Sequence, residues 1–136
     1  MFHLSTDTHR LTQHMPAHGP VRCLWRAEAA LGEGALWSAR EQALYWVDIV
    51  GQQLMRWSPG RQRRRQWRFA QVVTAVAERE NAPGLLLAMR DGVYTWDPAL
   101  PDLAPSLLCA LGEPPGNRCN RSEEHTSELQ SLAYLV

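Results

Sequence analysis

Two segments of the sequence, ALYWVDIVGQQLMRWSP at 43–59 and GLLLAMRDGVYTWDP at 84–98, share one pattern. Each starts with an apolar strand-forming run, passes through a glycine-containing hairpin and ends in Trp-x-Pro. The two tryptophans, Trp57 and Trp96, lie 39 residues apart, close to the roughly 40–45 residues of a four-stranded propeller blade. The repeat predicts an all-β chain built of propeller blades. Two unrelated hairpins in a β-sandwich are the alternative.

Short strands separated by turn residues are expected through most of the chain, and helical spacing is not evident. The six tryptophans are expected to supply packing within thin sheets. The arginine-rich stretch 61–65 resembles a nucleic-acid patch, but no stacking aromatics are spaced through it, so a solvated hairpin tip is favoured. The expected strands cover 35–37, 43–48, 53–57, 66–70, 72–77, 84–89, 93–96 and 106–111.

Length and charge narrow the class of protein. The chain has 136 residues and a formal net charge of zero, which suits a single domain and gives no field for attracting nucleic acid or an anionic membrane. We therefore expect no nucleic-acid, membrane or obligate protein partner. Three cysteines, none in a CxxC pair, and the lack of an apolar signal-peptide core predict a cytoplasmic protein with reduced thiols.

The two ends of the sequence differ from the middle. Residues 1–20 hold four of the five histidines without any periodicity, so a disordered leader is expected there rather than a metal-binding tract. Composition also changes abruptly at Arg121, and the stretch 121–131 resembles the forward translation of a common sequencing-library adapter. We expect a propeller fragment over 21–120 and a non-native tail over 121–136.

Three residues are candidates for chemistry. Glu33 stands between two glycines just before an apolar strand, where its carboxylate could face a cavity and bind a hard cation. Arg118 and Asn120 would share one side of a strand and could hold the oxygens of a small polar ligand. Taken alone, Glu33 is more simply interpreted as a solvated loop glutamate. Arg118 and Asn120 are more simply interpreted as part of a surface loop.

The segments GEGALW, ALYWVDI, LLLAMRDGVYTWDP and NRCN together resemble the SMP-30/gluconolactonase/luciferin-regenerating family over about residues 21–120. The resemblance implies the N-terminal two to three blades of a six-bladed β-propeller that hydrolyses sugar lactones. It implies one divalent cation, such as calcium or zinc, in the central channel. Glu33 matches the first metal-binding carboxylate, and Arg118 and Asn120 match the substrate-binding Arg-x-Asn-Asp-Gly motif. Here Arg121 replaces the aspartate of that motif.

In this family the cation acts as a Lewis acid and lowers the pKa of bound water, while a later aspartate serves as general base. That aspartate and the remaining metal ligands have no counterpart in this sequence, so the chain carries no catalytic residue and is expected to be inactive and poorly soluble. One alternative is a non-catalytic calcium-binding regulatory propeller of the regucalcin kind. An unrelated protein-interaction propeller is a further alternative.

Overall fold

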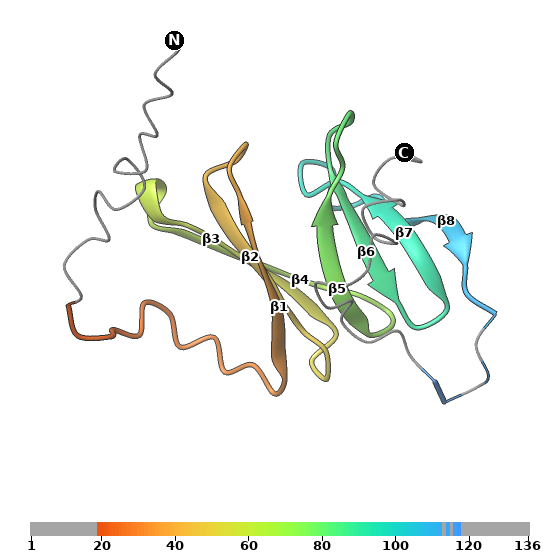
Figure 1. Cartoon of the computed structure of the whole chain (residues 1–136), viewed down its shortest axis with the longest axis horizontal. Coiled ribbons are helices and arrows are strands. Elements are labelled where there is room, and N and C mark those ends of the chain that lie inside the picture. Colours follow the sequence, from red (N-terminus) through yellow and green to blue (C-terminus); the bar gives the residue numbers. More distant parts are fainter. Residues whose placement is uncertain (1–18, 113, 115, 118–136) are drawn as a thin grey trace, which may run out of the picture.

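The computed structural model describes residues 19–112, 114 and 116–117, and these form two four-stranded antiparallel sheets (Figure 1). In each sheet the strands are hydrogen-bonded in chain order. This confirms the predicted all-β class. The first sheet contains β1 (Gly32–Ser38), β2 (Ala43–Asp48), β3 (Gln53–Ser58) and β4 (Arg63–Arg68). The second contains β5 (Val73–Glu78), β6 (Leu85–Met89), β7 (Gly92–Trp96) and β8 (Ser106–Ala110).

The two aligned sequence segments occupy the same place in the two sheets. The first forms the β2–β3 hairpin and the second forms the β6–β7 hairpin, so each supplies the two central strands of its sheet. Trp57 and Trp96, the matched tryptophans, both lie at the end of the third strand. The internal repeat is therefore a repeat of whole sheets, as propeller blades require.

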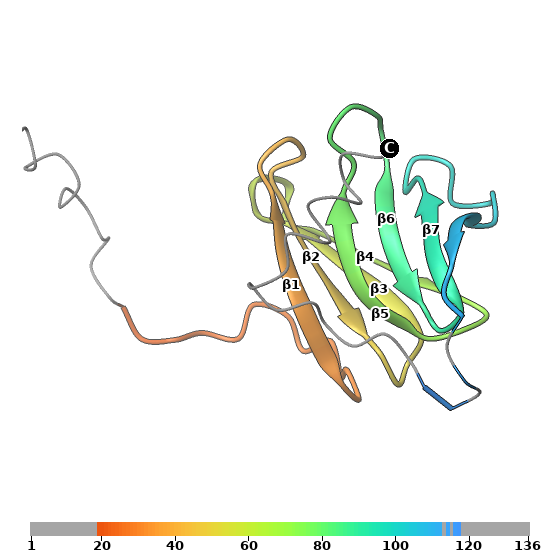
Figure 2. The ribbon, with the colours of Figure 1, turned by 45° about the vertical axis from the view of Figure 1, so that its right-hand side comes forward.

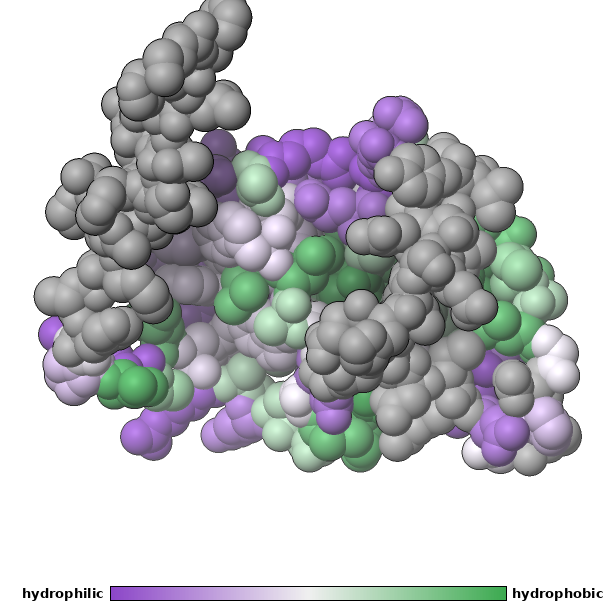
Figure 3. Space-filling model, viewed as in Figure 1, coloured by the Kyte–Doolittle hydropathy of each residue, from purple (hydrophilic) through white to green (hydrophobic). Residues whose placement is uncertain are grey.

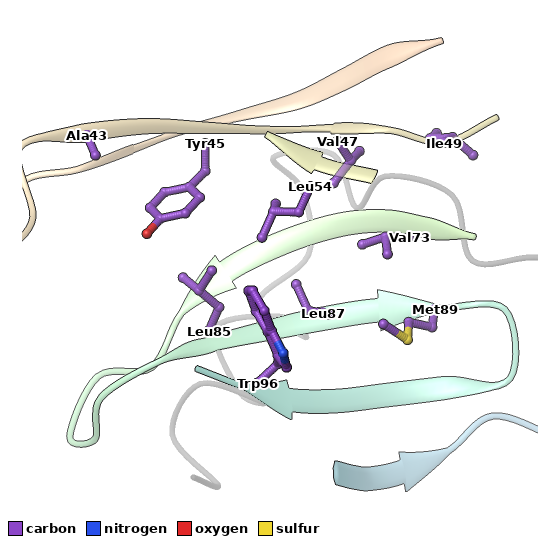
Figure 4. Packing of buried hydrophobic residues seen from close by; sticks show 10 residues of the cluster. All are labelled: Ala43, Tyr45, Val47, Ile49, Leu54, Val73, Leu85, Leu87, Met89 and Trp96. Atoms are coloured by element: carbon purple, nitrogen blue, oxygen red, sulfur yellow. The ribbon is translucent and has the colours of Figure 1, made fainter. Parts of the chain in front are cut away.

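A hydrophobic core fills the space between the two sheets (Figure 4). Alternate residues of β2 point toward the second sheet, and alternate residues of β6 point back, because side chains on a strand alternate between its faces. Trp96 reaches across and makes edge-to-face contacts with Trp67 and Phe69, with ring centroids 5.3 and 5.1 Å away. The buried cluster consists of Ala43, Tyr45, Val47, Ile49, Leu54, Val73, Leu85, Leu87, Met89 and Trp96.

The arrangement of the sheets brings their first strands together. β5 packs against β1 and β2 of the first sheet, and the views in Figures 1 and 2 agree on this placement. Each first strand has a one-residue irregularity near its start, between Glu33 and Leu36 in β1 and between Val73 and Ala75 in β5. Such bulges bend a strand and redirect its side chains. The inner edges of both sheets are thus shaped alike.

Polar contacts join the sheets at the end where β1 finishes. Arg40 pairs with Glu78 at 3.6 Å, and the Ser38 hydroxyl donates a hydrogen bond to the same carboxylate. The Arg40 guanidinium also donates to backbone carbonyls of the β5–β6 connection, at Arg79, Ala82 and Gly84. These contacts hold the two sheets at a fixed spacing beside the apolar core.

The arginine-rich stretch 61–65 forms the expected hairpin tip only in part. The turn is a short 3₁₀ helix at Pro59–Arg61, and Arg63, Arg64 and Arg65 already belong to β4. Gln62 adopts the left-handed conformation that ends the turn, with φ of 45°. Because β4 is the outer strand, arginines there stay solvated while the strand still pairs with β3. Among the residues described, no helix has the length and apolar character needed to cross a membrane.

Candidate functional site

Glu33 lies at the start of β1, in the bulge of the inner strand of the first sheet. It is opposite Val47 in the register, and the extra residue of the bulge follows it before pairing resumes at Leu36. Gly34 has a φ of 63°, a conformation that a side chain would strain. The Gly-Glu-Gly sequence thus allows the backbone to bulge at this point, which explains why two glycines flank the carboxylate.

The side chain of Glu33 is half-buried beside an open hollow of about 600 Å³. The hollow is lined by Gly32, Glu33, Gly34, Ala35 and the ring of Trp46. Among the described residues, no hydrogen bond or ion pair engages the Glu33 carboxylate. An unpaired carboxylate next to an open hollow can accept a cation or a donor group from a ligand.

Asp48 holds the segment that leads into Glu33. Its carboxylate accepts hydrogen bonds from the backbone N–H groups of Ala30 at 3.1 Å, Leu31 at 2.9 Å and Gly51 at 3.1 Å. Burial works against ionisation of Asp48, but these three donors, with the positive charge of Arg68, outweigh it and lower the pKa of the carboxyl group. Asp48 is therefore a positioning residue that fixes the entry into β1.

Sequence reasoning did not single out Asp48. The available signal was an aspartate at the end of an otherwise apolar strand, followed three residues later by a glycine, a pattern typical of a side chain that bonds to the backbone of a turn. The glycine is required, because a Cβ on Gly51 would lie 2.3 Å from the Asp48 carboxylate. The Asp48 carboxylate and Gly51 together stabilise the turn after β2.

The second sheet has no counterpart of Glu33. By register, the matching position in the β5 bulge is Thr74, which is fully buried and donates its hydroxyl to the carbonyl of Ala88 at 3.3 Å. Thr74 satisfies its polar atom internally, whereas Glu33 does not. The two inner strands therefore share a shape, and only the first presents an unpaired charged group.

The other predicted site residues, Arg118 and Asn120, lie outside the described residues, so their approach to Glu33 stays a prediction. Within the described residues, no group of three or more His, Cys, Asp or Glu side chains is placed to hold a metal ion. Glu33 by itself does not fit a cation, because a selective oxygen site needs several ligands held together.

A second polar hollow, of about 640 Å³, lies at the other end of the first sheet. Its one carboxylate among the described residues already has partners: Arg56 pairs with Glu41 at 3.1 Å, and Tyr45 donates its hydroxyl to Glu41 at 2.5 Å. Burial, followed by the hydrogen bond to Glu41, raises the pKa of Tyr45, so the phenol stays neutral. The carboxylate at this end of the sheet, Glu41, is therefore already engaged by Arg56 and Tyr45.

Two solved structures share the fold. A luciferin-regenerating enzyme is 23% identical, with a TM-score of 0.50, over 59% of this chain and 26% of that protein. A regucalcin from Agrobacterium tumefaciens str. C58, described as a calcium-binding protein, is 22% identical, with a TM-score of 0.51, over 57% of this chain and 25% of that protein. The likeness to these two structures identifies the two sheets as part of a β-propeller.

Two curated proteins match at higher identity. YvrE of Bacillus subtilis (strain 168), provisionally named a sugar lactone lactonase, is 38% identical over 50% of this chain and 23% of its own length. The 6-deoxy-6-sulfogluconolactonase of Pseudomonas putida is 34% identical over 57% of this chain and 26% of its own length. The chain thus spans about a quarter of the length of these relatives.

The sequence profile of the SMP-30/gluconolactonase/LRE-like region matches residues 31–123, which include both sheets and begin just before the Gly-Glu-Gly bulge. The match covers well over half of the chain. This chain belongs to the SMP-30/gluconolactonase/LRE-like family.

Proposed function

We propose that this chain is the N-terminal part of a metal-dependent hydrolase of sugar lactones. One structural observation carries the proposal. The inner strand of the first sheet presents a carboxylate, Glu33, that makes no hydrogen bond or ion pair with any described residue. The names of the two curated relatives supply the substrate class, since both are lactonases. A sugar lactone is therefore the small-molecule partner that we propose.

The proposed cation, calcium or zinc, needs more ligands than the described residues offer. Glu33 would contribute one oxygen, and the other ligands would come from sheets that follow these two in a complete ring. Arg118 and Asn120 are proposed to orient the hydroxyl groups of the sugar through charge-assisted and neutral hydrogen bonds. We also propose that the native sequence continues differently after Asn120.

The 136-residue chain itself is proposed to be inactive, since the described residues place no group of three or more His, Cys, Asp or Glu side chains around Glu33. Incubating it with glucono-lactone and calcium or zinc should give hydrolysis no faster than buffer, and calorimetry should detect only weak cation binding. Turnover above buffer that disappears in Glu33→Gln would contradict this assignment. The hydrolase itself is tested by the same two measurements on the protein from the uninterrupted gene, that is, the gene with its native sequence after Asn120. Glu33→Gln is the matched variant.

A regulatory calcium-binding propeller is the second candidate, favoured by the likeness to a regucalcin described as a calcium-binding protein. The two candidates differ in one outcome. If the protein from the uninterrupted gene binds calcium through Glu33 but hydrolyses no sugar lactone, the regulatory assignment replaces the catalytic one. If Glu33→Gln leaves metal affinity unchanged, both assignments fail.

A further inference from the structure

The polar hollow of about 640 Å³ lies at the end of the first sheet, between the β1–β2 and β3–β4 turns. Glu33 is at the other end of β1, so the hollow is separate from the lactone site proposed above. Figure 3 shows hydrophilic colouring along this end of the molecule, over the β1–β2 and β5–β6 connections that Figure 1 places at the top of the view. The side chains in its lining that the argument uses are Arg40, Glu41, Arg56, Ser58 and Arg61.

The hollow opens on the face of the first sheet that is turned toward the second sheet. Leu54 of β3 points into the core between the sheets, and Arg56 and Ser58 follow it on the same face because strand side chains alternate. Arg40 reaches from the lining to the second sheet, where its guanidinium donates to three backbone carbonyls of the β5–β6 connection. Both of the sheets that flank the hollow are therefore present in this chain.

Two buried polar atoms in the lining have no hydrogen-bond partner among the described residues. Ser58 is 5% exposed, and one of these atoms is its hydroxyl oxygen. The other is Nε of Arg56, whose guanidinium pairs with Glu41 only through Nη2. Buried polar groups in folded proteins are almost always hydrogen-bonded. Two unpaired groups on one face of β3 therefore indicate acceptor oxygens that the described part of the chain does not supply.

The charges around the hollow leave one positive charge without a partner. The two other arginines of the lining are each balanced by a glutamate. Arg61, exposed at the end of the short 3₁₀ turn, forms no ion pair with any described residue. A carboxylate carries one negative charge and two acceptor oxygens, which suits arginine donors. A phosphomonoester carries about −1.5 to −2 at pH 7 and would leave an excess of negative charge.

The second sheet shows that the repeat does not require these groups. Counted from the matched tryptophans, Arg56 and Ser58 correspond to Thr95 and Asp97. Neither is basic, and the Asp97 carboxylate accepts a hydrogen bond from the backbone N–H of Ala99 at 2.8 Å within its own turn. The arginine and the buried, unpaired serine are thus particular to the first sheet, which favours a ligand site over a packing role.

We propose that this hollow binds the carboxylate of a small organic acid that carries hydroxyl groups. The Ser58 hydroxyl and the Arg56 Nε–H donate to the carboxylate oxygens, and Arg61 supplies the opposite charge. Both donors are buried in the lining, and rotation about side-chain torsions turns them toward the ligand. Glu41 uses Oε2 for both of its contacts, so its Oε1 accepts from a ligand hydroxyl. Hollows of roughly 300–1,000 Å³ hold small molecules, so the rest of the acid has room.

Calorimetric titration of the 136-residue chain with sodium gluconate at pH 7 tests the proposal. Gluconate should bind about tenfold more tightly than inorganic phosphate or uncharged sorbitol. Ser58→Ala and Arg61→Gln should each weaken gluconate binding about tenfold, because each removes a donor to a charged group. Ser58→Ala should leave the Tm unchanged, since its hydroxyl has no partner among the described residues.

Arg90→Gln is the matched control, because it removes the same charge at an exposed residue of the β6–β7 turn, outside the hollow. It should bind gluconate as the native chain does. Arg56→Lys keeps a positive charge beside Glu41 but lacks the Nε–H, so it should bind more weakly, with circular dichroism confirming the fold. A native chain that binds no gluconate, phosphate that binds as tightly, or Arg90→Gln that weakens binding as much as Arg61→Gln would each overturn the proposal.

Saturation-transfer NMR covers the case in which the chain forms large particles, since the signal is read on the ligand. Gluconate protons should show the effect with the native chain and Arg90→Gln, and lose most of it with Arg61→Gln. Equal effects with all three would show non-specific binding, and the proposal would be wrong. Neither measurement uses lactone hydrolysis, so the outcome is independent of the proposed hydrolase.

Discussion

The two sheets share strand order, hairpin pattern and inner-strand bulge, yet their matched tryptophans have different environments. Trp96 is 5% exposed between the sheets and contacts two aromatic rings. Trp57 is only half-buried on the outer face of the first sheet, which is the face turned away from the second sheet. The difference arises because the first sheet covers Trp96 and nothing in the described structure covers Trp57 as fully. In a repeat fold, a position becomes core only when the neighbouring repeat is present.

The outer strands of the two sheets differ as well. β4 carries four arginines, which keep its open edge solvated and unsuited to pairing with another chain. β8 carries none, and its sequence, SLLCA, is neutral and largely apolar. The same position in the repeat is thus charged in one sheet and uncharged in the other.

Removing the tryptophan ring at the matched positions should give the largest effect. Trp96→Ala should lower the free energy of unfolding by about 3–5 kcal/mol, because it leaves a cavity between the sheets. Trp57→Ala, on the outer face, should cost no more than about 1–2 kcal/mol, since much of that ring is already in water. Urea denaturation followed by circular dichroism measures both. Equal losses would show that the two rings are buried alike.

Asp48 offers a second comparison, because Met89, a core residue, holds its place in the second sheet. Asp48→Asn should lower the free energy of unfolding by about 2–3 kcal/mol at pH 7, since a charged acceptor of three backbone hydrogen bonds is lost. Asp91→Asn, at an exposed turn of the second sheet, should have a smaller effect even though Asp91 accepts a bond from Tyr94 at 2.8 Å.

The effect of Asp48 depends on pH in a defined direction. Its folded pKa lies below the usual 3.8, so its contribution is fully present above the unfolded value and is lost as the pH falls through the folded value. The difference in stability between the native chain and Asp48→Asn should therefore be constant from pH 7 to about pH 5 and shrink below about pH 4. A difference that grows on acidification would contradict the hydrogen-bonded role.

The matched bulge residues should give the smallest effects. Thr74→Val should cost about 1 kcal/mol, because the carbonyl of Ala88 loses its donor in a buried position. Glu33→Gln should change stability by less than about 0.5 kcal/mol, since no described residue depends on its charge. Thermal unfolding of both variants measures this. A large loss in Glu33→Gln would mean that the carboxylate supports the fold rather than a ligand.

Sequence patterns predicted most of the fold but only part of the site. The all-β class and the matched hairpins are confirmed, because alternation, turn residues and the Trp-x-Pro endings are local signals. The arginine stretch 61–65 was assigned correctly only for its first two residues, since nothing local distinguishes a charged turn from a charged outer strand; pairing with β3 places residues 63–65 in the strand. Asp48 was missed because two of its three donors, Ala30 and Leu31, lie 18 and 17 positions away in the sequence.

The amino-acid sequence determined which segments become strands, where the hairpins turn and that Gly-Glu-Gly interrupts the first strand, since these depend on side-chain type over a few residues. Tertiary structure alone decided which of two equivalent tryptophans is buried and which of two equivalent bulges keeps a polar group that no described residue engages. The physical reason is that burial and hydrogen bonding are set by the neighbouring sheet, and a residue has the same local sequence whether or not that neighbour is present.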